Sequence, residues 1–332
     1  MDILITDNGS EVTEFILVGL SNHPKSQIAF YCTIVVVYLI TLMGNCLIII
    51  LVRVDRQLHT PMYFFLSNLS FLDICYSSNS VPFVLSIGLR DYPTISYNSC
   101  YAQMTIALFL GMTECLLLAV MAYDRFVAIS NPLRYVIIMN SRVCMQLALG
   151  TWTCAFLVAV TPIIAIPARY CGHNVINHFT CEVQALLKLV CSDTPVSLIL
   201  GLVIAMFTLP LPFTFILISY LRIVVAVLKI HSAEARLKAF STCGSHLTGV
   251  TIFYGTAIYM YLKPQSKESE EQNKIISVFY GVLTPMLNPL IYTLRNKDSL
   301  LLEAGNGQLC LFAHHLLIRC AKITRQHLRR LN

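Results

Sequence analysis

Long apolar runs constrain this chain more than any other feature of its sequence. Seven stretches reach the roughly 20 mostly apolar residues that a helix needs to cross a lipid bilayer. In lipid, every backbone polar group must be bonded within the protein, so the spans are expected to be helices. The alternating pattern of a membrane barrel is absent. The expected spans are approximately 28–52, 61–86, 98–123, 143–166, 197–228, 238–262 and 272–294.

The composition agrees with a membrane protein. Apolar residues make up 56% of the 332 residues and charged residues 12%, against about 45–50% and about 25% in soluble domains. We therefore expect an all-α membrane protein, a seven-transmembrane-helix bundle. A single seven-helix domain covers 28–298, with an extracellular segment at 1–27 and a basic cytoplasmic tail at 299–332.

Basic residues fix the expected orientation. With the N-terminus outside and the C-terminus cytoplasmic, the inner loops and tail hold 16 of the 23 Lys and Arg residues but only 5 acids. The outer segments hold 7 bases and 10 acids. This is the positive-inside asymmetry. The basic balance therefore indicates topology in a multi-pass plasma-membrane protein, in contact with lipid, and not nucleic-acid binding.

The outer segments also carry cysteines and a sequon. Four of the 13 cysteines fall there: Cys100, Cys171, Cys181 and Cys191. The outer face is oxidising, so an even set predicts two disulfides, and three pairings are open. Asn8 begins an Asn-Gly-Ser sequon and is the expected glycosylation site.

Polar residues recur within the spans. Charges near lipid either end a helix or perform a function, and buried ones face the bundle interior. Asp124-Arg125 could simply end the third span. The other polar or unusual positions are Gly44-Asn45, Asp73, Trp152, Ser219-Tyr220 and the run Asn288–Tyr292.

Five longer sequence motifs indicate a family resemblance: "LHTPMYFFLSNLSFLDICY" (58–76), "MAYDRFVAISNPLRY" (121–135), "KAFSTCGSHLT" (238–248), "FYGT" (253–256) and "PMLNPLIYTLRNKD" (285–298). This set resembles the rhodopsin-like G-protein-coupled receptors and, within them, the tetrapod-type odorant (olfactory) receptors. The resemblance covers roughly 10–298. The family has Tyr at Phe126 and Cys at Ser130. Its usual Lys-rich helix after Asp298 is replaced by an atypical tail, which we expect to be either a basic amphipathic segment or an altered C-terminus.

The resemblance implies roles for several of these residues. Cys100 would pair with Cys181, which leaves Cys171 with Cys191. Arg125 would lock the resting inner face with Asp124 as its partner and engage the G protein on opening.

The resemblance also implies a switch deeper in the bundle. Tyr220 and Tyr292 would swing inward on activation. Asn288-Pro289 would supply a weakened helix turn, since proline removes one backbone donor.

Asp73 and Glu114 are the two acids expected at bundle depth. Two carboxylates in a low dielectric cannot both stay ionised without a partner. Either one is protonated or a small cation lies between them, and the resemblance points to sodium. No other cofactor is expected.

The expected odorant pocket lies among the third, fifth and sixth spans, where the resemblance places the family's cavity. These spans carry apolar stripes at helical spacing, which are also typical of helix–helix packing. Ala107 stands where amine receptors carry an aspartate, so we expect a small, neutral, mostly apolar, volatile ligand. The expected contacts are Leu108, Gly111, Met112, Ile204, Phe207, Thr208, Tyr254, Ala257, Ile258 and Tyr261.

The function that follows is odorant binding coupled to a stimulatory olfactory-type heterotrimeric G protein that raises cyclic AMP. One alternative is a chemosensor of the same fold outside the olfactory epithelium, or a non-functional relative. A transporter or channel would need repeats or a polar path. No catalytic signature supports an enzyme.

Overall fold

The computed structural model describes residues 12–18, 24–88, 93–165, 170, 174–190, 195–262 and 267–294. Within these ranges it leaves out the side chains at 24–29, 195–198, 200, 202, 235, 238, 241, 242, 261, 262, 267–271 and 292–294. Contacts divide the chain into two compact units, Met1–Pro289 and Leu290–Asn332. The sites described below lie in the first unit.

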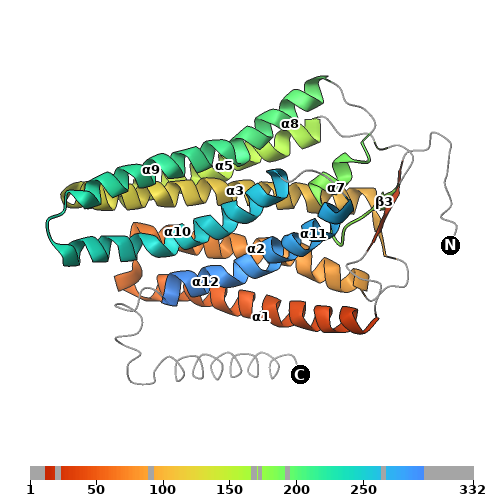
Figure 1. The fold of residues 1–332 in the computed structure, drawn as a ribbon, viewed down its shortest axis with the longest axis horizontal. Helices are drawn as coiled ribbons and strands as arrows, with labels where there is room; N and C mark the ends of the chain where they lie inside the picture. The colour runs from red at the N-terminus through yellow and green to blue at the C-terminus, as the bar shows by residue number, and fades with distance from the viewer. Residues whose placement is uncertain are drawn as a thin grey trace, which may run out of the picture. The chain divides into compact units, whose positions relative to one another are not determined.

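Helices dominate the described residues (Figure 1). Three long single helices come first: α1 (Pro24–Val54), α2 (Pro61–Gly88) and α3 (Tyr97–Ser130). The later long segments are α5 (Ser141–Ala155) with η3 (Phe156–Val160) and α6 (Thr161–Ala165); α8 (Pro195–Thr208) with α9 (Pro210–Leu228); α10 (Ala233–Leu262); and α11 (Lys267–Val278) with η4 (Phe279–Leu283) and α12 (Thr284–Leu294). Short turns of helix are η1 (Arg56–Leu58), η2 (Pro132–Arg134), α4 (Tyr135–Ile138) and α7 (Val183–Leu187).

Five helical segments in the described residues are long and apolar enough to cross a membrane: Phe30–Val54, Tyr97–Ser130, Ser141–Ala165, Val203–Leu228 and Gln272–Ile291. α2 and α10 have the length but are more polar. α2 carries Asp73 and several serines, and α10 begins with the run "AEARLKAFSTCGSHLTG". Polar residues in a membrane bundle turn toward its interior. The five segments are therefore consistent with a seven-helix bundle.

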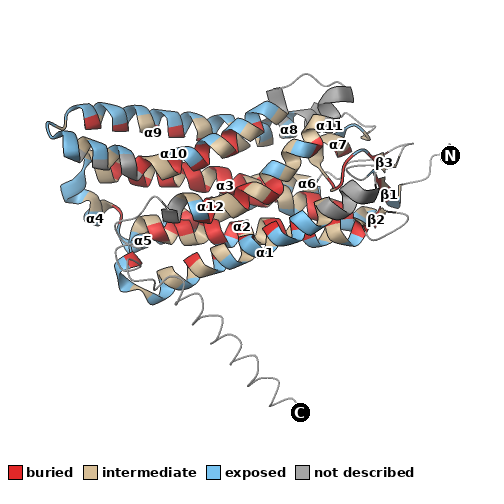
Figure 2. Ribbon diagram, turned by 60° about the horizontal axis from the view of Figure 1, so that its bottom comes forward, coloured by how far each residue is buried: buried red, intermediate tan, exposed pale blue. Residues whose placement is uncertain are grey.

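α3 is the central helix. Of its most apolar 18-residue window, 61% is buried, whereas the other four membrane candidates reach only 22–39%. α3 contacts α2, α5, α8, α9 and α10. Figure 2 shows the same contrast, with buried residues gathered along α3 and α2 and exposed residues along α9 and α1. Side chains on α3 are thus placed to reach most of the bundle.

A small sheet lies beside the start of α3. β1 (Glu14–Leu17) pairs antiparallel with β2 (Thr94–Ser96) and parallel with β3 (Val175–Ile176). Successive strand residues alternate between faces, and Phe15 and Leu17 of β1 are each 1% exposed. They pack in one cluster with Cys100 and Cys181. The sequence analysis assigned no structure to residues 1–27, so this strand is a new finding.

Candidate functional site

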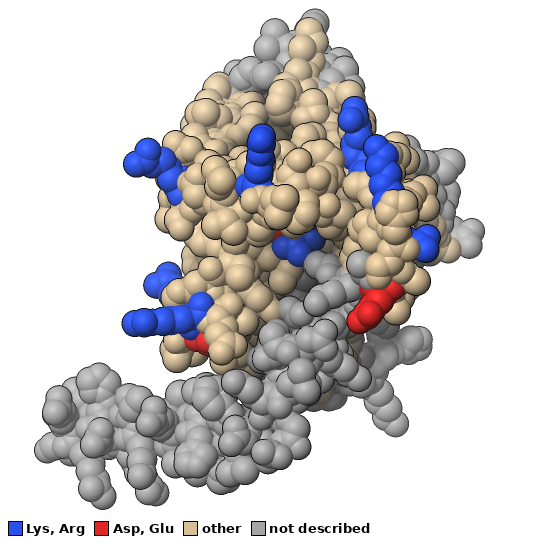
Figure 3. All heavy atoms as spheres, turned by 90° about the vertical axis from the view of Figure 1, so that its left-hand side faces the viewer, with Lys and Arg blue, Asp and Glu red and all other residues tan. Residues whose placement is uncertain are grey.

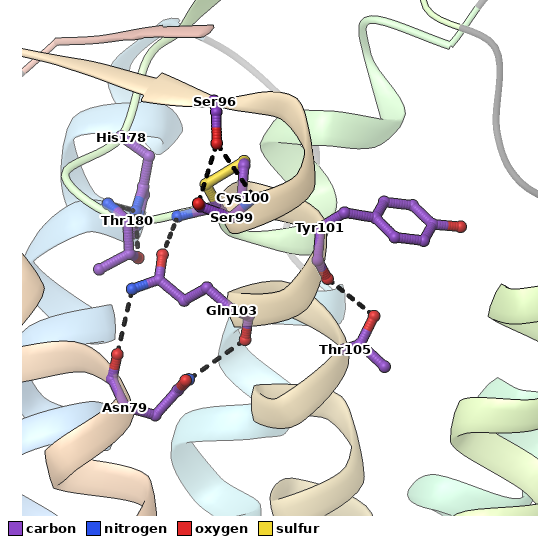
Figure 4. The surroundings of a disulfide bond; sticks show 10 residues. Asn79, Ser96, Ser99, Cys100, Tyr101, Gln103, Thr105, His178 and Thr180 are labelled. Carbon is purple, nitrogen blue, oxygen red and sulfur yellow. Dashed lines mark hydrogen bonds between the residues drawn. A yellow bond between two sulfur atoms is a disulfide. The ribbon is translucent and has the colours of Figure 1, made fainter. Parts of the chain in front are cut away.

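A disulfide joins the loop before α7 to α3. Cys100 bonds to Cys181, the pair that the resemblance implies, and both side chains are buried. The amide of Gln103 reinforces this attachment, because its Oε1 accepts a hydrogen bond from the Cys181 N–H at 3.1 Å. Gln103 also exchanges two 3.1 Å bonds with Asn79 of α2 (Figure 4). We call this region, with the β1–β3 sheet, the disulfide end. Cys171, Cys191 and Asn8 lie outside the described residues.

A cavity of about 150 Å³ lies next to this attachment. Its walls come from α2, α3, α10 and η4, from the junction of α8 with α9, and from loop residues 178–183, with Ile34 of α1. An apolar cavity of roughly this size holds a benzene-sized molecule. The described lining has no Lys, Arg or Asp, and Glu182 is its one carboxyl group. The site therefore suits a small neutral ligand.

Five of the expected pocket residues line the cavity: Leu108, Gly111, Met112, Thr208 and Ala257. Four others are not among the lining residues: Ile204, Phe207, Tyr254 and Ile258. Phe207 is 38% and Ile258 37% exposed, so both face away from the interior. Tyr254 is buried in a packed cluster with Cys115 and Leu118. The side chain of Tyr261 lies outside the described residues.

The cavity also uses residues that the sequence analysis did not select. Tyr76 and Ser80 come from α2, His178 from the loop and Tyr280 from η4. Gly111 leaves room for the Tyr280 side chain, because a Cβ at position 111 would lie 3.2 Å from the Tyr280 hydroxyl. Tyr76 ends one of the family motifs and His178 begins a His-x-x-Cys-Glu run, but apolar spacing cannot reveal which loop covers a bundle or where a helix widens to a π turn.

Two ionisable loop residues border the cavity, His178 and Glu182. Burial raises the pKa of Glu182 to about 7, while its Oε2 caps α7 by accepting from the Ala185 N–H at 3.0 Å. Burial lowers the pKa of His178 to about 4, and the nearby Lys274 charge acts in the same direction. His178 is therefore neutral at physiological pH. Within the described residues, no group of three or more His, Cys, Asp or Glu side chains could hold a metal.

Asp73 lies in the middle of the bundle. It is 1% exposed, and its two carboxylate oxygens accept from Asn288 Nδ2 at 3.2 and 3.1 Å. The buried Glu114 of α3 is close enough to interact with it electrostatically. The residues predicted at positions 73, 114 and 288 are thus brought together from α2, α3 and α12.

Pro289 leaves a gap in the α12 hydrogen-bond ladder that α1 fills. Proline has no N–H, so the carbonyl four residues earlier, at Pro285, loses its helical donor. Asn45 of α1 donates its Nδ2 to that carbonyl at 3.0 Å. The preceding Gly44 allows the approach, because a Cβ there would lie 3.3 Å from the Pro289 Cβ. The Gly44-Asn45 pair is therefore a partner of the predicted weak turn.

Asp124 accepts hydrogen bonds from two neighbours at the far end of α3. Arg125 donates to Asp124 Oδ2 through Nε, at 3.1 Å, and through Nη2. Tyr135 of α4 donates its hydroxyl to Oδ1 at 2.7 Å. Asp124 is 1% and Arg125 7% exposed. Figure 3 views this end, where Lys and Arg side chains are spread over the surface and few acidic ones appear.

A second node joins α9, α10 and α3 near the same end. His246 Nε2 lies 3.0 Å from the Leu118 carbonyl, which can only accept, so this nitrogen carries the proton. The neutral ring then accepts at Nδ1 from the Tyr220 hydroxyl, 2.8 Å away. His246 lies within a family motif but was not selected as a site residue. The side chain of Tyr292 is outside the described residues. We call the Asp124 and His246 nodes together the Asp124 end.

Comparison with known proteins agrees with this architecture. The family model for olfactory receptors matches residues 34–301. Human "Olfactory receptor 13H1" is 53% identical over 88% of this chain and 95% of its own length. Human "Olfactory receptor 13D1" is 49% identical over 88% of this chain and 85% of its own. Mouse "Olfactory receptor 5AR1" is 51% identical over 88% of this chain and 94% of its own.

The chain is therefore a membrane receptor of the G-protein-coupled class and not an enzyme. Within that class it belongs to the olfactory receptor family, which confirms the resemblance indicated by its sequence motifs.

Proposed function

We propose that this receptor binds small, neutral, mostly apolar odorants in the 150 Å³ cavity and activates a stimulatory olfactory-type G protein that raises cyclic AMP. The observation that carries the ligand class is the lining, which has no described Lys, Arg or Asp and whose one described carboxyl group, Glu182, already accepts a hydrogen bond from the Ala185 N–H. Burying an unpaired charge there would cost several kcal/mol. Contact area then supplies most of the affinity.

The same proposal includes the orientation. The disulfide end faces outside and the Asp124 end faces the cytoplasm of a plasma-membrane protein. A disulfide persists in an oxidising compartment, and the basic Asp124 end agrees with the positive-inside rule. Asn8, on the outer side, is the proposed glycosylation site, and Cys171–Cys191 the proposed second outer disulfide.

Signalling would open the Asp124 end. In the resting state Asp124 holds Arg125 and Tyr135, and Tyr220 is held by His246. Release of Arg125, with inward movement of Tyr220 and Tyr292 and bending at Asn288-Pro289, would form the G-protein surface. The ligand shifts this equilibrium only by its differential affinity for the two states.

Asp73 and Glu114 would hold a sodium ion that favours the resting state. Their fit rests on two buried, electrostatically linked carboxyls, neither of which forms a described ion pair. Oxygen ligands suit a hard cation. One protonated carboxyl is the alternative. Thermal unfolding measured in sodium and in potassium salts decides between these alternatives. Stabilisation by sodium that is lost in Asp73→Asn would support the bound ion. Equal stability in both salts would contradict it.

The function is tested by measuring cyclic AMP in cells that express this chain with an olfactory-type stimulatory G protein. The panel contains neutral volatile odorants and matched carboxylic acids and amines. We expect dose-dependent rises for the neutral compounds only, lost in Arg125→Ala at equal surface level. Responses restricted to the acids or amines, or silence of a receptor present at the surface, would contradict the proposal.

A further inference from the structure

One residue of the cavity lining has a buried polar atom without a partner. Six side-chain polar atoms in the described part of the chain are buried and unpaired, at Asn45, Ser130, His178, Arg236, Tyr254 and Asn273. Of these residues only His178 lines the cavity, and the unpaired atom is its Nε2. A buried donor without an acceptor costs about 1–3 kcal/mol. An arrangement of this kind is stable when a bound molecule supplies the acceptor.

The loop fixes which ring nitrogen is the donor. The backbone N–H of Thr180 donates to His178 Nδ1 at 3.1 Å, so Nδ1 has no proton and a neutral ring carries it on Nε2. The Thr180 hydroxyl lies 3.0 Å from the same Nδ1 (Figure 4). His178 is 4% exposed, and its ring stacks on Phe179 with centroids 4.4 Å apart. The ring is therefore held in one tautomer and one orientation.

Three other polar groups of the lining already have partners inside the protein. Gln103 bonds to Asn79 and to the Cys181 N–H, and the Thr208 hydroxyl donates to the Ile204 carbonyl. Glu182 caps α7. His178 thus supplies a donor not already used for structure, in a lining that is otherwise largely apolar.

We propose that His178 donates a hydrogen bond from Nε2 to the ligand and thereby selects odorants with one neutral acceptor oxygen, of the aldehyde and ketone class. This inference rests on the proposed function and names the ligand chemistry of the same cavity. The apolar walls enclose the hydrocarbon part, and the oxygen meets the donor at the loop side. An isosteric hydrocarbon would leave Nε2 unpaired.

The test uses matched pairs that differ only at the acceptor: cyclohexanone with methylenecyclohexane, and benzaldehyde with styrene. Dissociation constants come from ligand-dependent thermal unfolding of the purified full chain in lipid nanodiscs. We expect each carbonyl compound to bind about tenfold tighter than its alkene. The alkene-to-carbonyl ratio is the measured quantity, because general destabilisation affects both members of a pair equally.

Two variants separate the donor from the fold of the loop. His178→Asn keeps an acceptor for the Thr180 N–H, since Asn bonds backbone two residues on, but its side chain is too short to donate at the Nε2 position. His178→Gln places an amide N–H near that position. The ratio should fall to about 1 in His178→Asn and rise again in His178→Gln.

A ratio near 1 in the wild type, or a ratio unchanged in His178→Asn, would overturn the inference while leaving odorant binding intact. Binding of neither member of any pair by the wild type would instead remove the proposed function, and the inference with it.

Discussion

The two ends of the bundle are held by different kinds of bond. At the disulfide end, α3 is joined to the loop by a covalent bond, by a backbone–side-chain hydrogen bond and by a three-stranded sheet. At the Asp124 end, side-chain groups make the contacts: a carboxylate, a guanidinium, two phenols and an imidazole. Bonds of the second kind can be exchanged by side-chain rotation, without breaking a covalent bond or a backbone ladder.

Under the proposed function, this difference would separate recognition from response. The cavity and His178 lie at the end where the backbone is fixed, which preserves the shape that a ligand meets. The Asp124 end can exchange partners without unfolding, as a two-state switch requires. Four experiments test whether the separation holds, ordered from the largest expected effect to the smallest.

Removing the disulfide should cause the largest loss. Cys100→Ser opens a link between residues 81 positions apart, and loss of a native disulfide costs about 2–5 kcal/mol. Surface expression and the unfolding temperature of the purified receptor should both fall. The control is Cys32→Ser, at an exposed free cysteine. Equal behaviour of the two variants would mean that the sheet and Gln103 hold this end without the disulfide.

Asp124→Asn should act on signalling more than on folding. The variant loses a charge-assisted bond to Arg125, worth about 1.5–3 kcal/mol, and this favours the open state. Basal cyclic AMP should rise about tenfold or more relative to surface level. Tyr135→Phe, which removes only the bond to Oδ1, is the graded control and should give a smaller rise. A fall in basal signal with a large loss of surface protein would show that this end is structural too.

Tyr220→Phe removes one neutral hydrogen bond to His246 and keeps the ring that stacks on it. The free energy of unfolding should fall by about 0.5–1.5 kcal/mol. Tyr220 is not in the cavity lining, so it can affect odorant binding only through the resting–active equilibrium. Because loss of the bond to His246 would favour the active state, the odorant dissociation constant in nanodiscs should fall by about twofold to tenfold. An unchanged odorant dissociation constant would show that the two ends are not coupled in the absence of a G protein.

Glu182→Gln should have the smallest effect on signalling and be visible as a pH dependence of stability. The folded pKa is about 7 and the ordinary value is 4.5, so the folded protein keeps a proton that the unfolded chain has lost. The resulting stability is present below pH 4.5 and disappears as pH rises through 7. The unfolding temperature of Glu182→Gln, relative to wild type, should therefore rise between pH 5 and pH 8. A flat difference would place the Glu182 carboxyl in water.

The His178 contribution has the opposite sign. Its folded pKa of about 4 lies below the ordinary 6.5, so the associated stability is present above pH 6.5 and disappears as pH falls through 4. Both proteins in the Glu182 comparison carry His178, and its contribution cancels in their difference.

Long-range patterns in the sequence were enough for much of this architecture. The apolar runs predicted helices. The family motifs predicted the olfactory receptor family, and the resemblance implied the Cys100–Cys181 bond. The cavity was anticipated only in part, because helical spacing does not distinguish Met112, which lines it, from Ile258, which faces outward. The places of His178 and Tyr280 in the lining depend on how a loop and a π turn fold, which apolar spacing does not indicate.

The donation from Asn45 to the Pro285 carbonyl has a consequence for how the receptor is made. α1 emerges first from the ribosome and α12 is synthesised after it, 240 residues further along. The carbonyl of Pro285 therefore lacks its helical donor when α12 is made, and in the folded bundle Asn45 of α1 donates to it. Helix association in lipid is favoured by polar groups that satisfy one another. We therefore expect the hydrogen bond between α1 and α12 to form late in biosynthesis, after α12 has been inserted.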